Sequence, residues 1–225
     1  MGTFHAVVFD LDDTLYLERD FFLGGFIAVA GELARRGVAQ PQDLSTLLMD
    51  MHLQDREGVL DRAASLFGFP PTWVPELVSA FRHHRPQIRL ADEVPDVLRS
   101  LRAQSIRVGV VTDGFRDVQR RKISSLGLRP FVDTVVIADD HGRMYWKPHP
   151  SSLHRCMGQL GSKPDTTIFV GDNPERDVRG ARNAGVAVVR IRRPGAYFAD
   201  APSEGDRADQ EISDLTELTP ILQRP

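Results

Sequence analysis

The sequence predicts an α/β protein with a doubly wound parallel sheet and an inserted helical domain. Short apolar runs alternate with helical patterns through most of the 225 residues, as in sheets built from parallel strands and crossover helices. The segment 17–90 interrupts this alternation, because it carries helical patterns alone. Acidic or hydroxyl side chains follow several of the apolar runs, and open α/β sheets place their chemistry at such strand ends.

The expected strands are short apolar runs with little alternation, a pattern typical of strands covered on both faces. They span residues 4–10, 106–112, 132–137, 166–171 and 186–191. Residues 211–215 fit either a short closing strand or a helix. Between the strands, apolar residues at helical spacing predict helices over 94–104, 116–126, 151–160 and 175–184.

The segment 17–90 is expected to form four helices, over 22–36, 43–54, 59–67 and 74–82, with glycine and proline between them. We therefore expect a catalytic core made of residues 1–16 and 91–225, and an α-helical cap made of residues 17–90. Because the cap leaves from the carboxyl end of the first strand, it is expected to act as a lid over the site.

Composition excludes several classes of protein. The chain is 41% hydrophobic and 26% charged with a net charge of −3, so bulk electrostatics indicate no nucleic-acid partner. No apolar run approaches the ~20 residues of a membrane span, and no signal-peptide pattern is present. The single cysteine, Cys156, is expected to be a buried apolar group. A cytoplasmic location is the expectation, and the oligomeric state is left open.

Side chains that can take part in chemistry follow four of the predicted strands. Asp10 and Asp12 end the first strand, Thr112 and Asp113 end the second, and Lys147 follows the third. The fourth strand ends in Gly171-Asp172, with Asp177 shortly after. Crowded carboxylates raise one another's pKa unless a cation neutralises them. Doubly wound topology gathers these strand ends into one crevice.

Several carboxylates and few histidines form a hard-oxygen site, which suits Mg²⁺, and Asp10 and Asp172 are the expected ligands. A lysine adds positive charge, and a threonine hydroxyl can donate a hydrogen bond to a phosphoryl oxygen. Two aspartates two residues apart, Asp10 and Asp12, can divide the nucleophilic work from the acid–base work.

In these residues the chain resembles the haloacid dehalogenase superfamily, and the resemblance covers nearly its full length. The first motif of that family, D-x-D-x-T, matches residues 10–14, and its hydroxyl motif matches Thr112. The lysine motif matches Lys147-Pro148, and G-D-x-x-x-x-D matches residues 171–177. The resemblance implies a Rossmann-like core with the α-helical cap of subclass I.

The resemblance also implies roles for individual residues. Asp10 would be the nucleophile and a Mg²⁺ ligand. Asp12 would be the general acid and base, and would bind Mg²⁺ through its backbone carbonyl. Thr112 and the backbone N–H of Asp113 would hold the phosphoryl group.

The remaining motif residues would complete the charge balance of the site. Lys147 would pair with the phosphoryl oxygens and Asp10, and Asp172 would ligate Mg²⁺ directly or through water. Asp177 would support this arrangement by orienting Lys147 or a metal-bound water.

The expected function is Mg²⁺-dependent hydrolysis of a small phosphate monoester through an aspartyl-phosphate. The partner would be a small phosphorylated metabolite: a sugar phosphate, a nucleotide or a phospho-acid. A phosphomutase with the same residues and a non-catalytic binding module of the same fold are the alternatives. A dehalogenase is disfavoured, because it needs neither Mg²⁺ nor an acid at the position of Asp12.

Three further features have plainer interpretations. Arg116, Arg120, Arg121 and Lys122 are expected to form a solvated basic face on one helix. Asp13 is expected to be solvated or to cap a helix, and Asn173 is expected to cap one.

Overall fold

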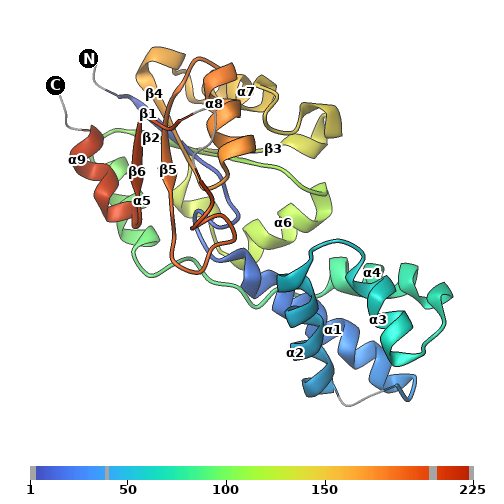
Figure 1. Ribbon diagram of the computed structural model, residues 1–225. Helices are drawn as coiled ribbons and strands as arrows, with labels where there is room; N and C mark the ends of the chain where they lie inside the picture. Colours follow the sequence, from blue (N-terminus) through green and yellow to red (C-terminus); the bar gives the residue numbers. More distant parts are fainter. Residues whose placement is uncertain (1–3, 39–40, 203–206, 223–225) are drawn as a thin grey trace. The chain divides into compact units, whose positions relative to one another are not determined.

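The computed structural model describes residues 4–38, 41–202 and 207–222 (Figure 1). The chain divides into two units. One comprises Met1–Glu18 and Arg89–Pro225, and the other comprises Arg19–Ile88. We refer to them as the core unit and the helical unit. The sequence-based division, 1–16 with 91–225 and 17–90, is close to this one.

The core unit contains a six-stranded parallel sheet in the order β3-β2-β1-β4-β5-β6. The strands are β1 (Ala6–Phe9), β2 (Arg107–Thr112), β3 (Thr134–Ile137), β4 (Thr167–Gly171), β5 (Ala187–Ile191) and β6 (Gln210–Ile212). The predicted fold class, a doubly wound parallel sheet with an inserted helical segment, is confirmed. For the C-terminal segment, a short strand or a helix was expected. The structure has a strand first, β6, and a short helix follows it.

Helices lie on both faces of this sheet, with α7 and α8 on one face and α5 on the other (Figure 1). The helices of the core unit are α5 (Val94–Ala103), α6 (Arg116–Ser125), α7 (Ser151–Leu160), α8 (Arg179–Asn183) and α9 (Leu218–Leu222). Short helical turns are η2 (Arg129–Phe131), η3 (Ala138–Asp140), η4 (Arg143–Tyr145), η5 (Pro164–Thr166), η6 (Pro174–Val178) and η7 (Leu215–Glu217). The apolar face of α7 packs on the sheet and buries Cys156 completely, as expected.

The predicted helix over 175–184 is divided in the structure. It starts as the π-helical turn η6 and continues as α8. The Asn173 side chain accepts hydrogen bonds from the backbone N–H groups of Glu175 (2.9 Å) and Arg176 (3.1 Å), which confirms Asn173 as a helix cap. The wider first turn also lets the Asp177 carboxylate turn back to accept from the Asn173 N–H at 2.9 Å.

Strand register brings the motif residues to one edge of the sheet. Phe9 pairs with Val110 of β2 and with Val170 of β4. The backbone N–H of Asp10 then donates to the carbonyl of Val170 at 2.8 Å. Asp10 therefore leaves the sheet beside the end of β4, where Asp172 begins the next loop. This placement follows from the parallel order alone.

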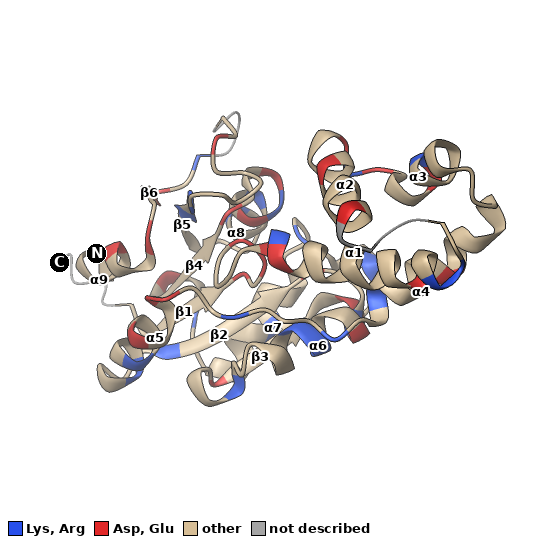
Figure 2. Ribbon diagram, turned by 90° about the horizontal axis from the view of Figure 1, so that it is seen from below, with Lys and Arg blue, Asp and Glu red and all other residues tan. Residues whose placement is uncertain are grey.

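The helical unit consists of α1 (Glu18–Arg35), α2 (Pro41–Gln54), α3 (Val59–Phe67), η1 (Pro71–Trp73) and α4 (Val74–His83), and α1 begins in the core unit. Its four helices match the four predicted ones, with α1 starting earlier. Phe26, Leu33, Leu48, Ala63 and Leu77 are among the residues of its own hydrophobic core. Charges of both signs are scattered over both units (Figure 2).

Within the described part of the chain, no helix has the length and apolar character needed to cross a membrane.

Candidate active site

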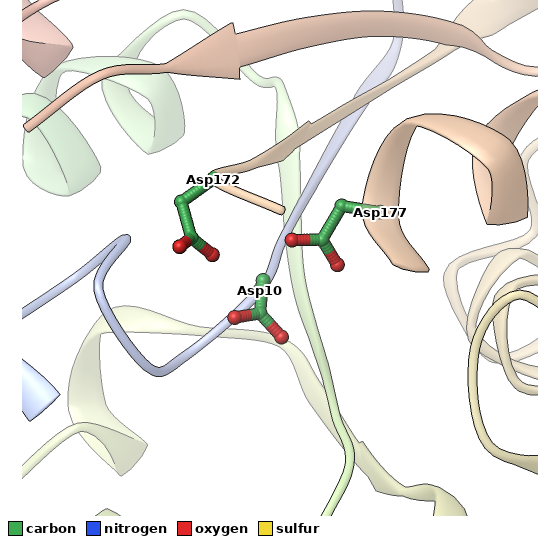
Figure 3. A group of neighbouring side chains, drawn as sticks. All are labelled: Asp10, Asp172 and Asp177. Carbon is green, nitrogen blue, oxygen red and sulfur yellow. The ribbon is translucent and has the colours of Figure 1, made fainter. Parts of the chain in front are cut away.

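Three buried carboxylates meet at the carboxyl edge of the sheet. Asp10 follows β1, Asp172 follows β4, and Asp177 lies in η6. One oxygen from each lies within 4.8 Å of the others, and the three side chains are close neighbours (Figure 3). The exposed fraction of each residue is 6% or less. A donor set made of carboxylate oxygens fits a hard cation such as Mg²⁺.

The electrostatics of this cluster show why a cation suits it. Burial raises the pKa of Asp10 well above its ordinary value; Lys147 opposes this, and Asp177 adds to it. Burial likewise raises the pKa of Asp172, with further repulsion from Asp177 and Asp10. The carboxylates together carry more negative charge than the single ammonium of Lys147 offsets. Further positive charge would favour their ionised forms.

Lys147 is the cation within the cluster. Its Nζ pairs with Asp10 Oδ1 and lies 2.7 Å from Asp177 Oδ1. Burial alone lowers the pKa of Lys147, but Asp10, Asp177 and Asp113 outweigh it and raise the pKa well above its ordinary value. The other Asp177 oxygen accepts from the N–H of Asn173. Asp177 is therefore engaged on both oxygens, and it fixes the ammonium beside Asp10.

The second strand contributes Thr112 and Asp113. Thr112 ends β2 and is fully buried. The Asp113 carboxylate accepts from the backbone N–H of Lys147 at 3.0 Å, so it anchors the loop that carries the lysine. Burial raises the pKa of Asp113, while Lys147 opposes that rise. The sequence indicated only the backbone N–H of Asp113, and this side-chain role was missed.

The Asp12 carboxylate lies outside the three-carboxylate cluster and has its own set of donors. Oδ1 accepts from Lys122 Nζ at 2.7 Å and from the Tyr16 hydroxyl, and Oδ2 accepts from Gln119 Nε2 at 2.9 Å. Burial by itself raises the pKa of Asp12, but the charge of Lys122 and these hydrogen bonds outweigh it and lower the pKa. Asp10 and Asp12 therefore sit in contrasting environments.

The expectation of a solvated basic face on α6 is wrong for one of its residues. Arg116, Arg120 and Arg121 are exposed, but Lys122 is 3% exposed and pairs with Asp12 and Glu18. The helical repeat explains the difference, because Lys122 lies three residues after the buried Gln119, and residues three apart share a helix face.

A sequence profile described as haloacid dehalogenase-like hydrolase matches residues 7–191. The chain belongs to this family. The resemblance drawn from the four motifs, and with it the prediction of a hydrolase, is confirmed.

Relatives of the chain are named for different activities. Glyceraldehyde 3-phosphate phosphatase of Methanopyrus kandleri is 29% identical over 236 residues, covering 97% of both chains. The crystal structure of a haloacid dehalogenase-type phosphatase from Thermococcus onnurineus is 26% identical, with a TM-score of 0.65 and 97% coverage of both chains. A 2-haloacid dehalogenase from Pseudomonas syringae pv. Tomato is also 26% identical, with a TM-score of 0.64, covering 97% of this chain and 98% of that one. The named relatives thus include both phosphatases and a dehalogenase.

Two buried arginines, which sequence reasoning missed, support the loops of this hydrolase site. Arg190, the residue before the last of β5, donates from Nε to the carbonyl of Asp172 at 3.1 Å. Arg193 donates to the carbonyl of Thr14 at 2.8 Å and to Glu93 at 2.7 Å. An arginine inside an apolar strand is the signal that could have found Arg190, since a buried guanidinium needs acceptors.

Asp13 is buried rather than solvated. Its carboxylate accepts from the backbone N–H of Glu18 (2.8 Å) and of Tyr197 (3.0 Å), so it caps the start of α1 and also holds the segment after β5. Burial raises the pKa of Asp13 to about 6. The capping alternative is thus the one that the structure bears out.

Gly171 is required by the close approach of Asp177. A Cβ at position 171 would lie 2.5 Å from Asp177 Cγ and 2.6 Å from its Oδ2. Only glycine leaves room there for the carboxylate that positions Lys147. The spacing of the motif is thereby explained, because the residue at 177 folds back over the glycine that ends β4.

Proposed function

We propose that this enzyme is a Mg²⁺-dependent phosphohydrolase that cleaves a small phosphate monoester through an aspartyl-phosphate on Asp10. The observation that carries the proposal is the contrast between two neighbouring aspartates. Asp10 lies among carboxylates and the Lys147 ammonium, whereas Asp12 has separate donors. A carboxylate beside the expected cation suits the nucleophile, and a carboxylate held apart from it suits the acid–base group.

The metal would be held by the side chains of Asp10 and Asp172 and by the backbone carbonyl of Asp12. Asp177 supports this set from outside, since Lys147 and Asn173 engage its oxygens. When bound, Mg²⁺ supplies positive charge that offsets the repulsion between the Asp10 carboxylate and an anionic phosphate.

The chain's own groups then account for both half-reactions. The Thr112 hydroxyl, the Asp113 N–H and the Lys147 ammonium hold the phosphoryl oxygens. An Asp10 oxygen attacks phosphorus while the bond to the leaving alcohol breaks, and Asp12 gives that alcohol its proton. Asp12 then takes a proton from water as the water oxygen attacks phosphorus, which releases phosphate and restores Asp10.

The donors around Asp12 also favour a phosphatase over a dehalogenase. Halide departs without a proton, so a dehalogenase has no need for an acid there. In this chain, Tyr16, Gln119 and Lys122 all contact the Asp12 carboxylate. A group fixed from three directions is consistent with a role in proton transfer.

The substrate would be a sugar phosphate, a nucleotide or a phospho-acid, and the helical unit would act as the cap that selects it. The relative named as a glyceraldehyde 3-phosphate phosphatase supports a small phosphorylated metabolite. The insertion of this unit directly after the catalytic loop supports that proposal.

The test is phosphate release from p-nitrophenyl phosphate and from a panel of phosphorylated metabolites, with Mg²⁺ and with a chelator. We expect Mg²⁺-dependent release from at least one metabolite and no isomerised product. An isomerised phosphate ester as the main product would indicate a mutase. Halide release from a 2-haloacid would indicate a dehalogenase, and no turnover with any divalent metal would favour a binding module.

A further inference from the structure

We infer that Gln119 is a positioning residue of this reaction, which ties the Asp12 carboxylate to the Thr112 hydroxyl and sets the orientation of both. The inference rests on the proposed phosphatase function and adds a residue that the family motifs do not include. Gln119 lies on the first turns of α6 and is 1% exposed. It is a neutral side chain buried at a site of charged ones.

The side-chain amide nitrogen of Gln119 donates hydrogen bonds to two of the proposed catalytic groups. Nε2 lies 2.9 Å from Asp12 Oδ2 and 2.6 Å from Thr112 Oγ1. A carboxylate only accepts hydrogen bonds, so the amide nitrogen, and not its oxygen, must face Asp12. The two protons of the NH₂ group are thus divided, one to each partner.

This contact decides the direction of the Thr112 hydroxyl proton. Because Oγ1 accepts from Gln119, its own proton is left to donate elsewhere. Its acceptor in the structure is the carbonyl of Asp113, at a long 3.4 Å. A phosphoryl oxygen at normal hydrogen-bond distance would replace this weak contact. Gln119 therefore prepares Thr112 as a donor to phosphate.

The same contact fixes the second oxygen of Asp12. Lys122 and Tyr16 both hold Oδ1, which leaves the carboxylate able to turn about that anchored oxygen. Gln119 holds Oδ2 and prevents this rotation. Oδ2 is then the oxygen that exchanges a proton with the leaving alcohol, since its described partner is a neutral amide.

The turn after β2 is shaped to let Gln119 reach these partners. Gly114 has a φ of +112°, and a Cβ there would lie 3.2 Å from Gln119 Cδ and 3.3 Å from its Oε1. The glutamine side chain therefore runs against the backbone of this turn. A residue with a side chain at position 114 would be strained and would crowd it.

The experiment compares Gln119→Met with the wild type on two substrates. p-Nitrophenyl phosphate has a leaving group that departs without a proton, whereas an alkyl phosphate needs the proton from Asp12. We expect kcat/KM to fall roughly 10-fold on the aryl ester through Thr112, and roughly 100-fold on the alkyl ester through Thr112 and Asp12 together. Gln104→Met, at an exposed glutamine at the end of α5, is the matched control and should change neither value.

Wild-type turnover of both esters tests the proposed function by itself. With that turnover measured, equal losses on the two esters, or no loss on either, would overturn the inference and leave the phosphatase in place. If circular dichroism shows that Gln119→Met does not fold, Gln119→Asn is used instead. Its losses of kcat/KM should be smaller, and the loss on the alkyl ester should again exceed the loss on the aryl ester. In an Asp12→Asn background, the extra loss on the alkyl ester should disappear, because its route through Asp12 is gone.

Discussion

The substitution Gly171→Ala tests whether catalysis depends on the position of the Asp177 carboxylate. The new Cβ would lie 2.5 Å from Asp177 Cγ, whereas unstrained carbon atoms lie about 3.5 Å apart, so the carboxylate must move by about 1 Å. Asp177 is 1% exposed, and moving it disturbs its pairing with Lys147 at 2.7 Å and its contact with the Asn173 N–H at 2.9 Å.

The expected losses follow from that displacement. Overpacking of this kind costs about 1–3 kcal/mol of the free energy of unfolding. A misplacement of about 1 Å at a catalytic group lowers kcat/KM by roughly 100-fold. Thermal unfolding and steady-state phosphate release, measured on the same preparation, separate the two effects.

The matched control is Gly158→Ala on α7, where an added Cβ has nothing within 4 Å. That exchange should leave kcat/KM unchanged and stabilise the helix by up to about 1 kcal/mol. The reasoning is refuted if Gly171→Ala keeps the wild-type kcat/KM, because catalysis would then not depend on the position of the Asp177 carboxylate.

Two further predictions concern metal binding and pH. Asp12→Asn should leave Mg²⁺ affinity near that of the wild type, while Asp172→Asn should weaken it by at least about 10-fold in calorimetric titration, because Asp172 would bind the metal with its side chain and Asp12 only with its backbone carbonyl. Equal losses would contradict the assignment. In the helical unit, burial and then the charges of Arg56 and Arg62 lower the pKa of His52 from 6.5 to about 4. Protonation therefore favours the unfolded state, so the stability due to neutral His52, about 1–3 kcal/mol, is present above pH 6.5 and is lost as the pH falls toward 4. His52→Phe should flatten the dependence of the melting temperature on pH over this range, and an unchanged slope would count against this explanation.

The sequence was sufficient to predict the charged cluster because parallel topology supplies the missing distances. Asp10, Lys147 and Asp172 are far apart along the chain, but each follows a strand of one parallel sheet, and such strands end at one edge. Their meeting could be predicted without coordinates. The roles assigned to them are chemical, and they stay proposals.

The support around Asp12 could not be predicted in the same way. Lys122 belongs to the basic run that was expected to form a solvated face, and Gln119 lies on the same helix but was not singled out. A polar side chain can be buried when it has a hydrogen-bond or ion-pair partner in a distant segment, which here is Asp12. The local sequence pattern contains no information about such a partner. Arg190 is a different case, because an arginine within an apolar strand was a visible signal. Only the identity of its acceptors, which are backbone carbonyls of other segments, required the structure.

The central claim is that Asp10 carries the phosphoryl group during turnover. The direct measurement is an acid quench of the enzyme with Mg²⁺ and a phosphate ester within the first turnover, followed by peptide mass spectrometry. The account predicts phosphorylation of the peptide that contains Asp10, at that aspartate, and none in Asp10→Asn. Phosphate release by the wild type with no modified Asp10, or undiminished turnover by Asp10→Asn, would contradict it.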